Sequence, residues 1–232
     1  MDNEVIRMQF TGRKPKKYAL LGMAGGVLFM VGDCLIFCYE GLGASGVQPL
    51  WAQMPEWRFV LSAVLGFIGT ALMLPAGISV YRMIAESCGK VCRILTTLYL
   101  IGVASTGYLH FSLGSLMPLT YISVLSEGGT EELAASAAQR WGGYFAGLNI
   151  VLIGFLCLGF ALHFYVTVSG RSGLPRWFCL VGPVGAFALG ILWKLVFAGT
   201  AAEGAYGSCE SLGEGLIFLT AYFYHKKGTA GK

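Results

Sequence analysis

Six ionisable and amide side chains within the apolar segments of this chain are candidates for chemistry. They are Asp33, His110, Asn149, Lys194, Glu210 and Glu214. An ionised side chain at the centre of a bilayer costs roughly 3 kcal/mol or more unless it is paired, hydrated or neutralised. Each of these residues is therefore a candidate for a functional role.

The charges of this set do not balance. Three carboxyl groups, from Asp33, Glu210 and Glu214, are matched only by Lys194 and by His110, a residue type that is only partly charged near neutral pH. Protonation, water, or a bound cation must compensate for the excess negative charge. The sequence therefore predicts an outward-facing acidic pocket within the membrane. This pocket would bind, and could transport, a cation or a small cationic or protonatable ligand.

Two other classes of function stay open. In the first, the chain is an intramembrane enzyme that acts on a lipid or other apolar substrate, with His110 and a carboxyl group as acid and base, or with a metal ion bound by Asp33, His110 and Glu214. In the second, the chain is a structural or partner-binding membrane subunit. Lys194 would then extend toward the membrane surface or pair with Glu210. The sequence identifies no cofactor.

One short segment bears on the enzyme hypothesis. Val31-Gly32-Asp33-Cys34-Leu35 resembles the Gly-Asp-x-Leu pattern on a helix of lysoplasmalogenase-type membrane proteins. The resemblance covers about five residues of this chain and implies a lipid-directed activity that involves Asp33. Members of that family are expected to have more than six spans.

Composition assigns the chain to the polytopic membrane proteins. It is 56% hydrophobic and 12% charged, whereas soluble domains carry about 25% charged residues. The basic residues lie at the borders of apolar segments, so the net charge of +4 does not indicate nucleic-acid binding. The seven cysteines do not form a disulfide framework by their spacing, and Cys88 and Cys92 are interpreted as structural.

The predicted fold is an all-α bundle of six transmembrane spans in a single domain, residues 18–225. Basic tails precede and follow it at 1–17 and 226–232. The spans are expected at about 18–39, 59–84, 94–116, 141–168, 177–198 and 207–224.

The distribution of basic residues predicts the orientation. With the N-terminus inside, the inner segments hold thirteen of the 16 Lys and Arg residues. The outer segments hold only Arg58 and Arg140, and Lys194 lies within a span. The positive-inside rule therefore favours cytoplasmic termini, in the cytoplasmic membrane if the protein is bacterial.

Counting residues along the expected helices estimates the depth of each polar side chain. Asp33, His110, Lys194, Glu210 and Glu214 are all expected in the outer half of the bilayer, and Asn149 falls slightly higher than Asp33. Glu214 lies deeper, with no assigned partner, so it is the strongest single candidate, with Asp33 and His110 beside it. His163 and His225 fall near the cytoplasmic ends of their helices.

Local signals complete the prediction. Gly22 and Gly26 indicate close helix packing, and Pro75 predicts a kink. Pro118 and Gly128-Gly129 bound a segment expected to be less regular, and whether residues 117–139 form a lid is left open. Thr130 is the expected N-cap of a helix that runs on into the fourth span. Gly182-Pro183 predicts a soft break in the fifth.

Overall fold

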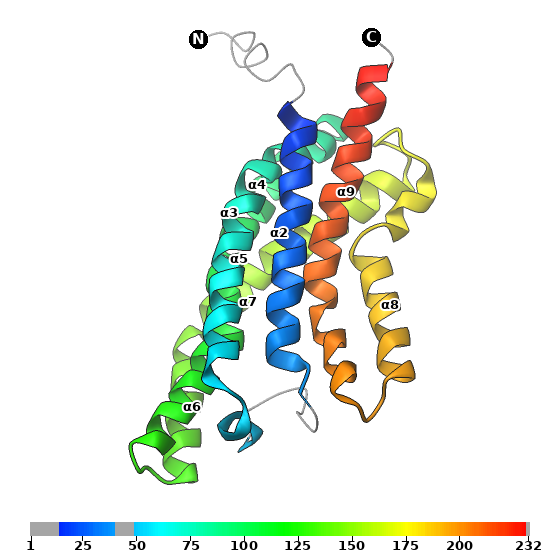
Figure 1. Cartoon of the computed structure of the whole chain (residues 1–232). Helices are drawn as coiled ribbons and strands as arrows, with labels where there is room; N and C mark the ends of the chain where they lie inside the picture. Colours follow the sequence, from blue (N-terminus) through cyan, green and yellow to red (C-terminus); the bar gives the residue numbers. More distant parts are fainter. Residues whose placement is uncertain (1–13, 40–48, 231–232) are drawn as a thin grey trace.

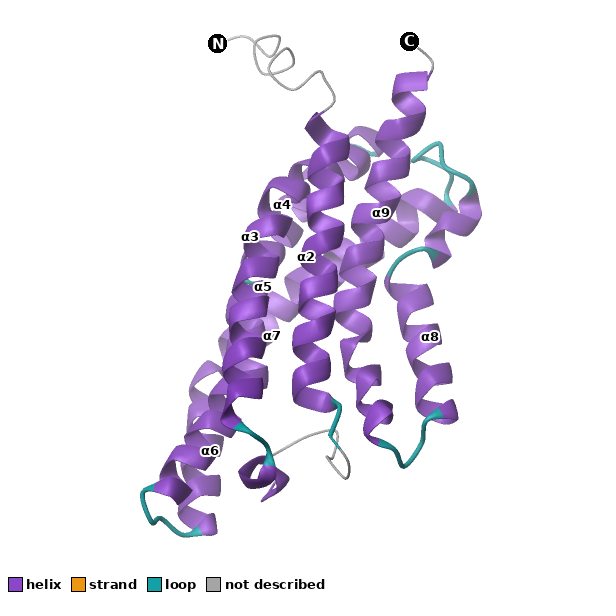
Figure 2. Cartoon of the chain, in the orientation of Figure 1, coloured by secondary structure: helices purple, strands orange, loops and turns teal. Residues whose placement is uncertain are grey.

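The structure is a computed structural model that describes residues 14–39 and 49–230. Within those ranges the chain forms helices and turns and no strand (Figure 2). The α-helices are α2 (Lys14–Phe37), α3 (Glu56–Ser87), α4 (Lys90–Ala104), α5 (Thr106–His110), α6 (Leu116–Ser126), α7 (Glu131–Val168), α8 (Pro183–Val196) and α9 (Cys209–Ala230). A π-helical turn, η2 (Phe111–Ser115), joins α5 to α6, and the 3-10 helices are η1 (Pro49–Gln53), η3 (Arg176–Leu180) and η4 (Ala201–Ser208).

Four helical segments are long and apolar enough to cross a bilayer. They are Pro15–Phe37, Glu56–Ser87, Thr106–Ser126 and Glu131–Val168. The long helical runs alternate in direction, with α4, α5 and α6 following one another the same way, so the start of α2 and the end of α9 lie at the same end of the bundle (Figure 1). The all-helical membrane architecture is supported, while the count of six spans and the cytoplasmic placement of both ends stay predictions.

The fifth predicted span is interrupted more strongly than expected. The chain forms η3, then an extended Gly182, and α8 begins only at Pro183. Proline favours the first position of a helix because its missing N–H has no partner there in any case. α8 has 14 residues and is therefore about 21 Å long, shorter than a hydrocarbon core of about 30 Å.

The segment after Pro118 is more regular than predicted. Pro118 lies buried in the first turn of α6, directly after the π-helical turn η2, and the helix continues to Ser126. The helix ends before Gly128, whose φ of 85° lies in the left-handed region that favours glycine. Residues on both sides of this turn form a helical hairpin of α6 and α7.

α7 begins where the sequence predicts. Thr130 caps it, because its Oγ1 accepts a hydrogen bond from the backbone N–H of Leu133 at 3.3 Å. The helix is 38 residues long, about 57 Å, and so exceeds the thickness of the bilayer core. Its first turns pack on α6 and η1 through a small apolar cluster that includes Tyr121, Ala134 and Trp51.

α2 lies between α3 and α9 and contacts both closely (Figure 1). A Cβ added at Gly26 would lie 2.7 Å from the Cα of Gly215 on α9, and one at Gly22 would lie 2.5 Å from the Phe218 ring. The predicted small-residue stripe is therefore confirmed as the contact between α2 and α9. α3 continues through Pro75 as one helix.

Arg58, one of the two basic residues expected outside, holds the end of α2. Its Nε donates to the Leu35 carbonyl at 2.6 Å, and its Nη2 donates to the Cys38 carbonyl at 2.8 Å. Basic side chains stabilise the unpaired carbonyls at helix C-termini. This contact fixes the last turn of α2, the turn that follows Asp33.

Cys88 and Cys92 form a disulfide between the end of α3 and the start of α4. The other five cysteines are free. The pairing of Cys88 with Cys92 was not predicted, since neighbours four residues apart meet only if the intervening turn brings them together.

Candidate functional site

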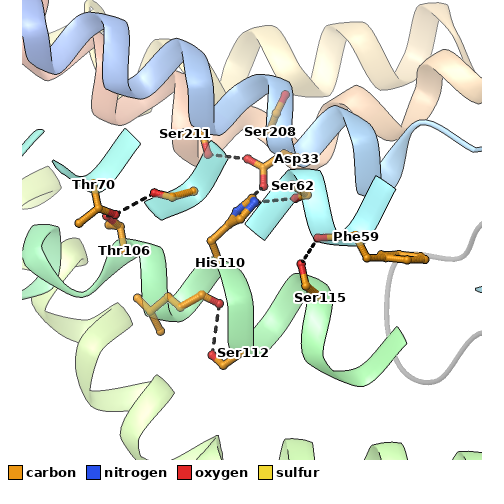
Figure 3. Close-up of polar contacts among 12 residues, drawn as sticks. Asp33, Phe59, Ser62, Thr70, Thr106, His110, Ser112, Ser115, Ser208 and Ser211 are labelled. Atoms are coloured by element: carbon orange, nitrogen blue, oxygen red, sulfur yellow. Dashed lines mark hydrogen bonds and ion pairs between the residues drawn. The ribbon is translucent and has the colours of Figure 1, made fainter. Parts of the chain in front are cut away.

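His110 is the centre of a buried polar network. Its Nδ1 lies 3.3 Å from Oδ1 of Asp33 on α2, and its Nε2 lies 2.7 Å from Oγ of Ser62 on α3 (Figure 3). An ionised carboxylate can only accept hydrogen bonds, so against such a group Nδ1 must carry the hydrogen. Nε2 is then free to exchange a hydrogen bond with Ser62.

The backbone changes form at His110. α5 ends at this residue, and the following five residues make the π-helical turn η2. Single π turns are rare within α-helices and frequently occur at functional sites. Here the turn follows directly on the histidine that α5 presents to α2 and α3.

Two glycines make room for the imidazole ring. A Cβ added at Gly66 on α3 would lie 2.6 Å from Cδ2 of His110, and one at Gly32 on α2 would lie 2.9 Å from its Nε2. Phe29 meets the ring edge-on, with 5.2 Å between centroids. The ring is therefore enclosed on several sides and held in one position.

Asp33 joins this network to the last helix. Its Oδ2 accepts a hydrogen bond from Ser211 of α9 at 2.5 Å (Figure 3). Because Oδ1 faces His110, both carboxyl oxygens have partners, and the residue is buried. Asp33 thus links α2, α5 and α9.

Glu214 is buried more deeply than Asp33 and has fewer partners. Only 3% of its surface is exposed. Its Oε2 accepts a hydrogen bond from the hydroxyl of Tyr99 on α4 at 2.9 Å, whereas its Oε1 has no partner among the described residues. The Tyr99 ring lies against Gly159 of α7, where an added Cβ would be 2.0 Å from the ring.

A cavity of about 180 Å³ connects these groups. Asp33, His110, Glu210 and Glu214 all line it. The remaining lining residues are Phe29, Ile36, Phe37, Met73, Thr106, Leu109, Leu113, Gly114, Ile153, Leu156, Gly207 and Ser211.

The exposed residues of the cavity lining lie on η2, on η4 and in the first turn of α9, and we take these residues as its mouth. Glu210 and Leu113 are lining residues that are also exposed, whereas Glu214 is a lining residue that is buried. Glu210 lies in the first turn of α9, where the helix dipole favours a carboxylate. Glu210 and Glu214 are one turn apart and thus lie on the same face of α9.

The other two predicted site residues lie elsewhere. Asn149 is buried on α7, and its Oδ1 accepts a hydrogen bond from Ser112 of η2 at 3.2 Å. Lys194 is exposed on α8, with its Nζ 4.0 Å from Oε1 of Glu203 and 5.3 Å from the centre of the Tyr206 ring. The suggested pairing of Lys194 with Glu210 is therefore wrong, because Glu203 in the α8–α9 connection lies closer.

The two remaining histidines do not line the cavity. His163 is buried on α7, where a Cβ added at Gly182 would lie 2.6 Å from its ring. The Nε2 of His225 lies 3.0 Å from the carbonyl oxygen of Ser79. Both histidines therefore lie outside the candidate site, whereas their depth in the membrane stays a prediction.

The acidic residues do not converge as metal ligands. Among the described residues, no group of three or more His, Cys, Asp and Glu side chains is arranged to hold a metal ion. Asp33, His110 and Glu214 share a cavity wall, but the partners of each are hydroxyl groups or one another. The site is an acidic cavity lined by separate carboxyl groups.

Three hydrogen-bonding residues of the site were not predicted. Ser62, Tyr99 and Ser211 each complete the environment of His110, Glu214 or Asp33. Serine is common in membrane helices, so Ser62 and Ser211 carry no distinguishing signal. Tyr99 carries none either, because it is the sixth residue of the third predicted span, 94–116, and tyrosine is common near the ends of membrane helices.

Fold and site together define a class: an all-helical membrane protein with a buried acidic cavity between its helices. The family model described as "Family of unknown function (DUF6796)" matches residues 1–228, and the chain belongs to that family. No curated protein and no solved structure matches the chain.

Proposed function

We propose that this membrane protein binds a small cationic or protonatable ligand in the cavity between α2, α5 and α9. The observation that carries the proposal is the composition of the cavity wall. Asp33, Glu210 and Glu214 supply three carboxyl groups, and His110 is the sole basic side chain among the lining residues. Lys194, the other basic residue expected at this depth, is exposed and pairs with Glu203.

The numbers of hydrogen-bond partners distinguish the buried carboxyl groups and indicate where a bound cation would stabilise the protein most. Asp33 has partners on both oxygens, whereas Glu214 has one hydrogen bond, and its second oxygen lacks a partner among the described residues. A buried polar atom without a partner costs about 1–3 kcal/mol. A cationic group beside Glu214 would offset both that cost and the excess of acidic groups.

The position of the mouth supports access from the outer side. If both termini are cytoplasmic, the end of α2 and the start of α9 face outward, and Glu210 is the first carboxyl group that an entering cation meets. Transport would need a second opening toward the inner side.

Ligand-dependent stabilisation of the protein tests the binding proposal. A ligand that binds only the folded state raises the melting temperature with increasing concentration. The protein in lipid nanodiscs is heated with a graded series of monovalent, divalent and organic cations. We expect at least one class of cation to stabilise the native protein and the Glu203→Gln variant equally. Its affinity for the Glu214→Gln variant should be at least tenfold lower. Glu203 is the matched control because it lies outside the cavity.

Two results would contradict the proposal. If no cation stabilises the protein, the polar residues serve packing alone, as in a structural subunit. If Glu203→Gln and Glu214→Gln weaken binding equally, the ligand recognises general negative charge and not the cavity. Uptake of the stabilising cation into sealed vesicles that contain the protein then separates transport from binding.

One observation favours a second function, acid–base catalysis on an apolar substrate. Asp33, His110 and Ser62 form a continuous chain of contacts, the order in which a carboxylate orients a histidine in many hydrolases. Ser62 is fully buried and does not line the cavity, so His110 would be the group that meets the substrate. Mass spectrometry of a lipid extract incubated with the protein tests this. Products that disappear with His110→Gln but persist with Glu203→Gln would support catalysis, and an unchanged extract would contradict it.

A further inference from the structure

The cavity has two chemically different walls. The α9 side carries Glu210, Ser211 and Glu214. The α7 side carries only Ile153 and Leu156, which belong to one apolar cluster with Phe29, Met73 and Leu109. A bare ion would use the acidic wall and leave the apolar wall without a partner.

The size of the cavity indicates the size of a matching ligand. A cavity of roughly 150 Å³ lined by apolar side chains binds benzene in an engineered protein. The present cavity, of about 180 Å³, is therefore large enough for one six-membered ring and a short polar substituent. It is larger than a single dehydrated metal ion or ammonium ion requires.

The donor set also favours an organic cation over a metal ion. Metal ions in proteins are held by several ligands that converge on one point, and the described residues contain no such group of three. An ammonium group requires less convergence, because its hydrogens point in different directions. Glu210 and Glu214, one turn apart on α9, can each accept one of them.

From these features we propose that the ligand is a primary amine that bears a single apolar group about the size of a phenyl ring. This inference rests on the proposed function and specifies its ligand class. The ammonium group lies between the carboxyl groups of Glu210 and Glu214, and the apolar group lies against Ile153, Leu156 and Met73.

This proposal is tested by comparing a compound that has both a positive charge and an apolar ring with compounds that have only one of these features. Benzylamine has both, benzyl alcohol keeps the ring without the charge, and methylammonium and sodium keep the charge without the ring. Melting temperatures are measured in lipid nanodiscs against concentration for the native protein, Glu210→Gln, Glu214→Gln and the control Glu203→Gln. We expect benzylamine to bind the native protein and the control at least tenfold more tightly than the other three compounds. Glu210→Gln and Glu214→Gln should each lower the affinity for benzylamine at least tenfold.

The comparison among compounds uses the native protein, so it holds even if Glu214→Gln fails to fold. Glu210→Gln supplies a second variant at an exposed position. If methylammonium or sodium binds through Glu214 as tightly as benzylamine, the amine class is wrong while the proposed cation site stands. If benzyl alcohol binds as tightly as benzylamine and neither cavity variant matters, both the ligand class and the proposed function are overturned.

Discussion

The helices of this protein carry two pairs of an acidic and a basic side chain, and the pairs differ in burial and in hydrogen bonding. Asp33 and His110 are buried among three helices and share further hydrogen bonds with Ser211 and Ser62. Lys194 and Glu203 are 4.0 Å apart, with 48% and 35% of their side-chain surfaces exposed. Removing one partner from a buried pair leaves an uncompensated polar group, whereas an exposed pair contributes little.

The comparison shows that depth along a helix does not identify a site. Asp33 and Lys194 were expected at similar depths in the outer half of the bilayer. The direction in which each helix faces separates them: α2 turns Asp33 toward α5 and α9, whereas α8 turns Lys194 outward. Only the buried pair lines the cavity.

The largest effect is expected from breaking the buried pair. Asp33→Ala removes the partner of His110 Nδ1 and of the Ser211 hydroxyl, both of which remain buried or half-buried. We expect a loss of about 3–5 kcal/mol in the free energy of unfolding, measured by denaturant titration in mixed micelles. Glu203→Ala is the matched control at the exposed pair. Equal losses from the two variants would remove the distinction between the pairs.

The second prediction concerns the space that holds His110. Gly66→Ala places a Cβ within 2.6 Å of the imidazole, which cannot move freely because both its nitrogens have partners. Overpacking of this kind costs about 1–3 kcal/mol. Gly154→Ala on α7 is the control, because an added Cβ there meets nothing within 4 Å. The control should be neutral or slightly stabilising, since alanine favours a helix more than glycine does.

The third prediction concerns Glu214. Tyr99→Phe removes the hydrogen bond to Oε2 and leaves the buried carboxyl group without a partner among the described residues. We expect a loss of about 1–2 kcal/mol of unfolding free energy. Tyr108→Phe is the control, because the buried Tyr108 hydroxyl has no partner among the described residues. A ligand that binds at Glu214 should recover part of the loss in Tyr99→Phe. If Tyr99→Phe is as stable as Tyr108→Phe, the hydrogen bond between Tyr99 and Glu214 contributes nothing to stability.

The apolar segments, the Thr130 cap and the glycine contacts of α2 could be predicted from the sequence because each depends on local composition or spacing. The gathering of Asp33, His110 and Glu214 around one cavity could be anticipated from their depths and the shortage of basic partners. Ser62 and Tyr99 could not be assigned, because their roles depend on how α3 and α4 are rotated about their axes. That rotation is set by packing contacts such as Tyr99 against Gly159, which no periodicity within either helix reveals.

The smallest effect is expected at the exposed pair, and it completes the comparison. Lys194→Ala, Glu203→Ala and the double variant form a cycle that isolates the interaction between the two side chains. We expect a coupling of about 0.2–1 kcal/mol that decreases with added salt, because both groups are partly exposed and their charges are screened. The same cycle applied to Asp33 and His110 should give a larger coupling that changes little with salt. A large, salt-independent coupling between Lys194 and Glu203 would mean that α8 faces an environment as dry as the cavity, and would place a second buried charge pair in the bundle.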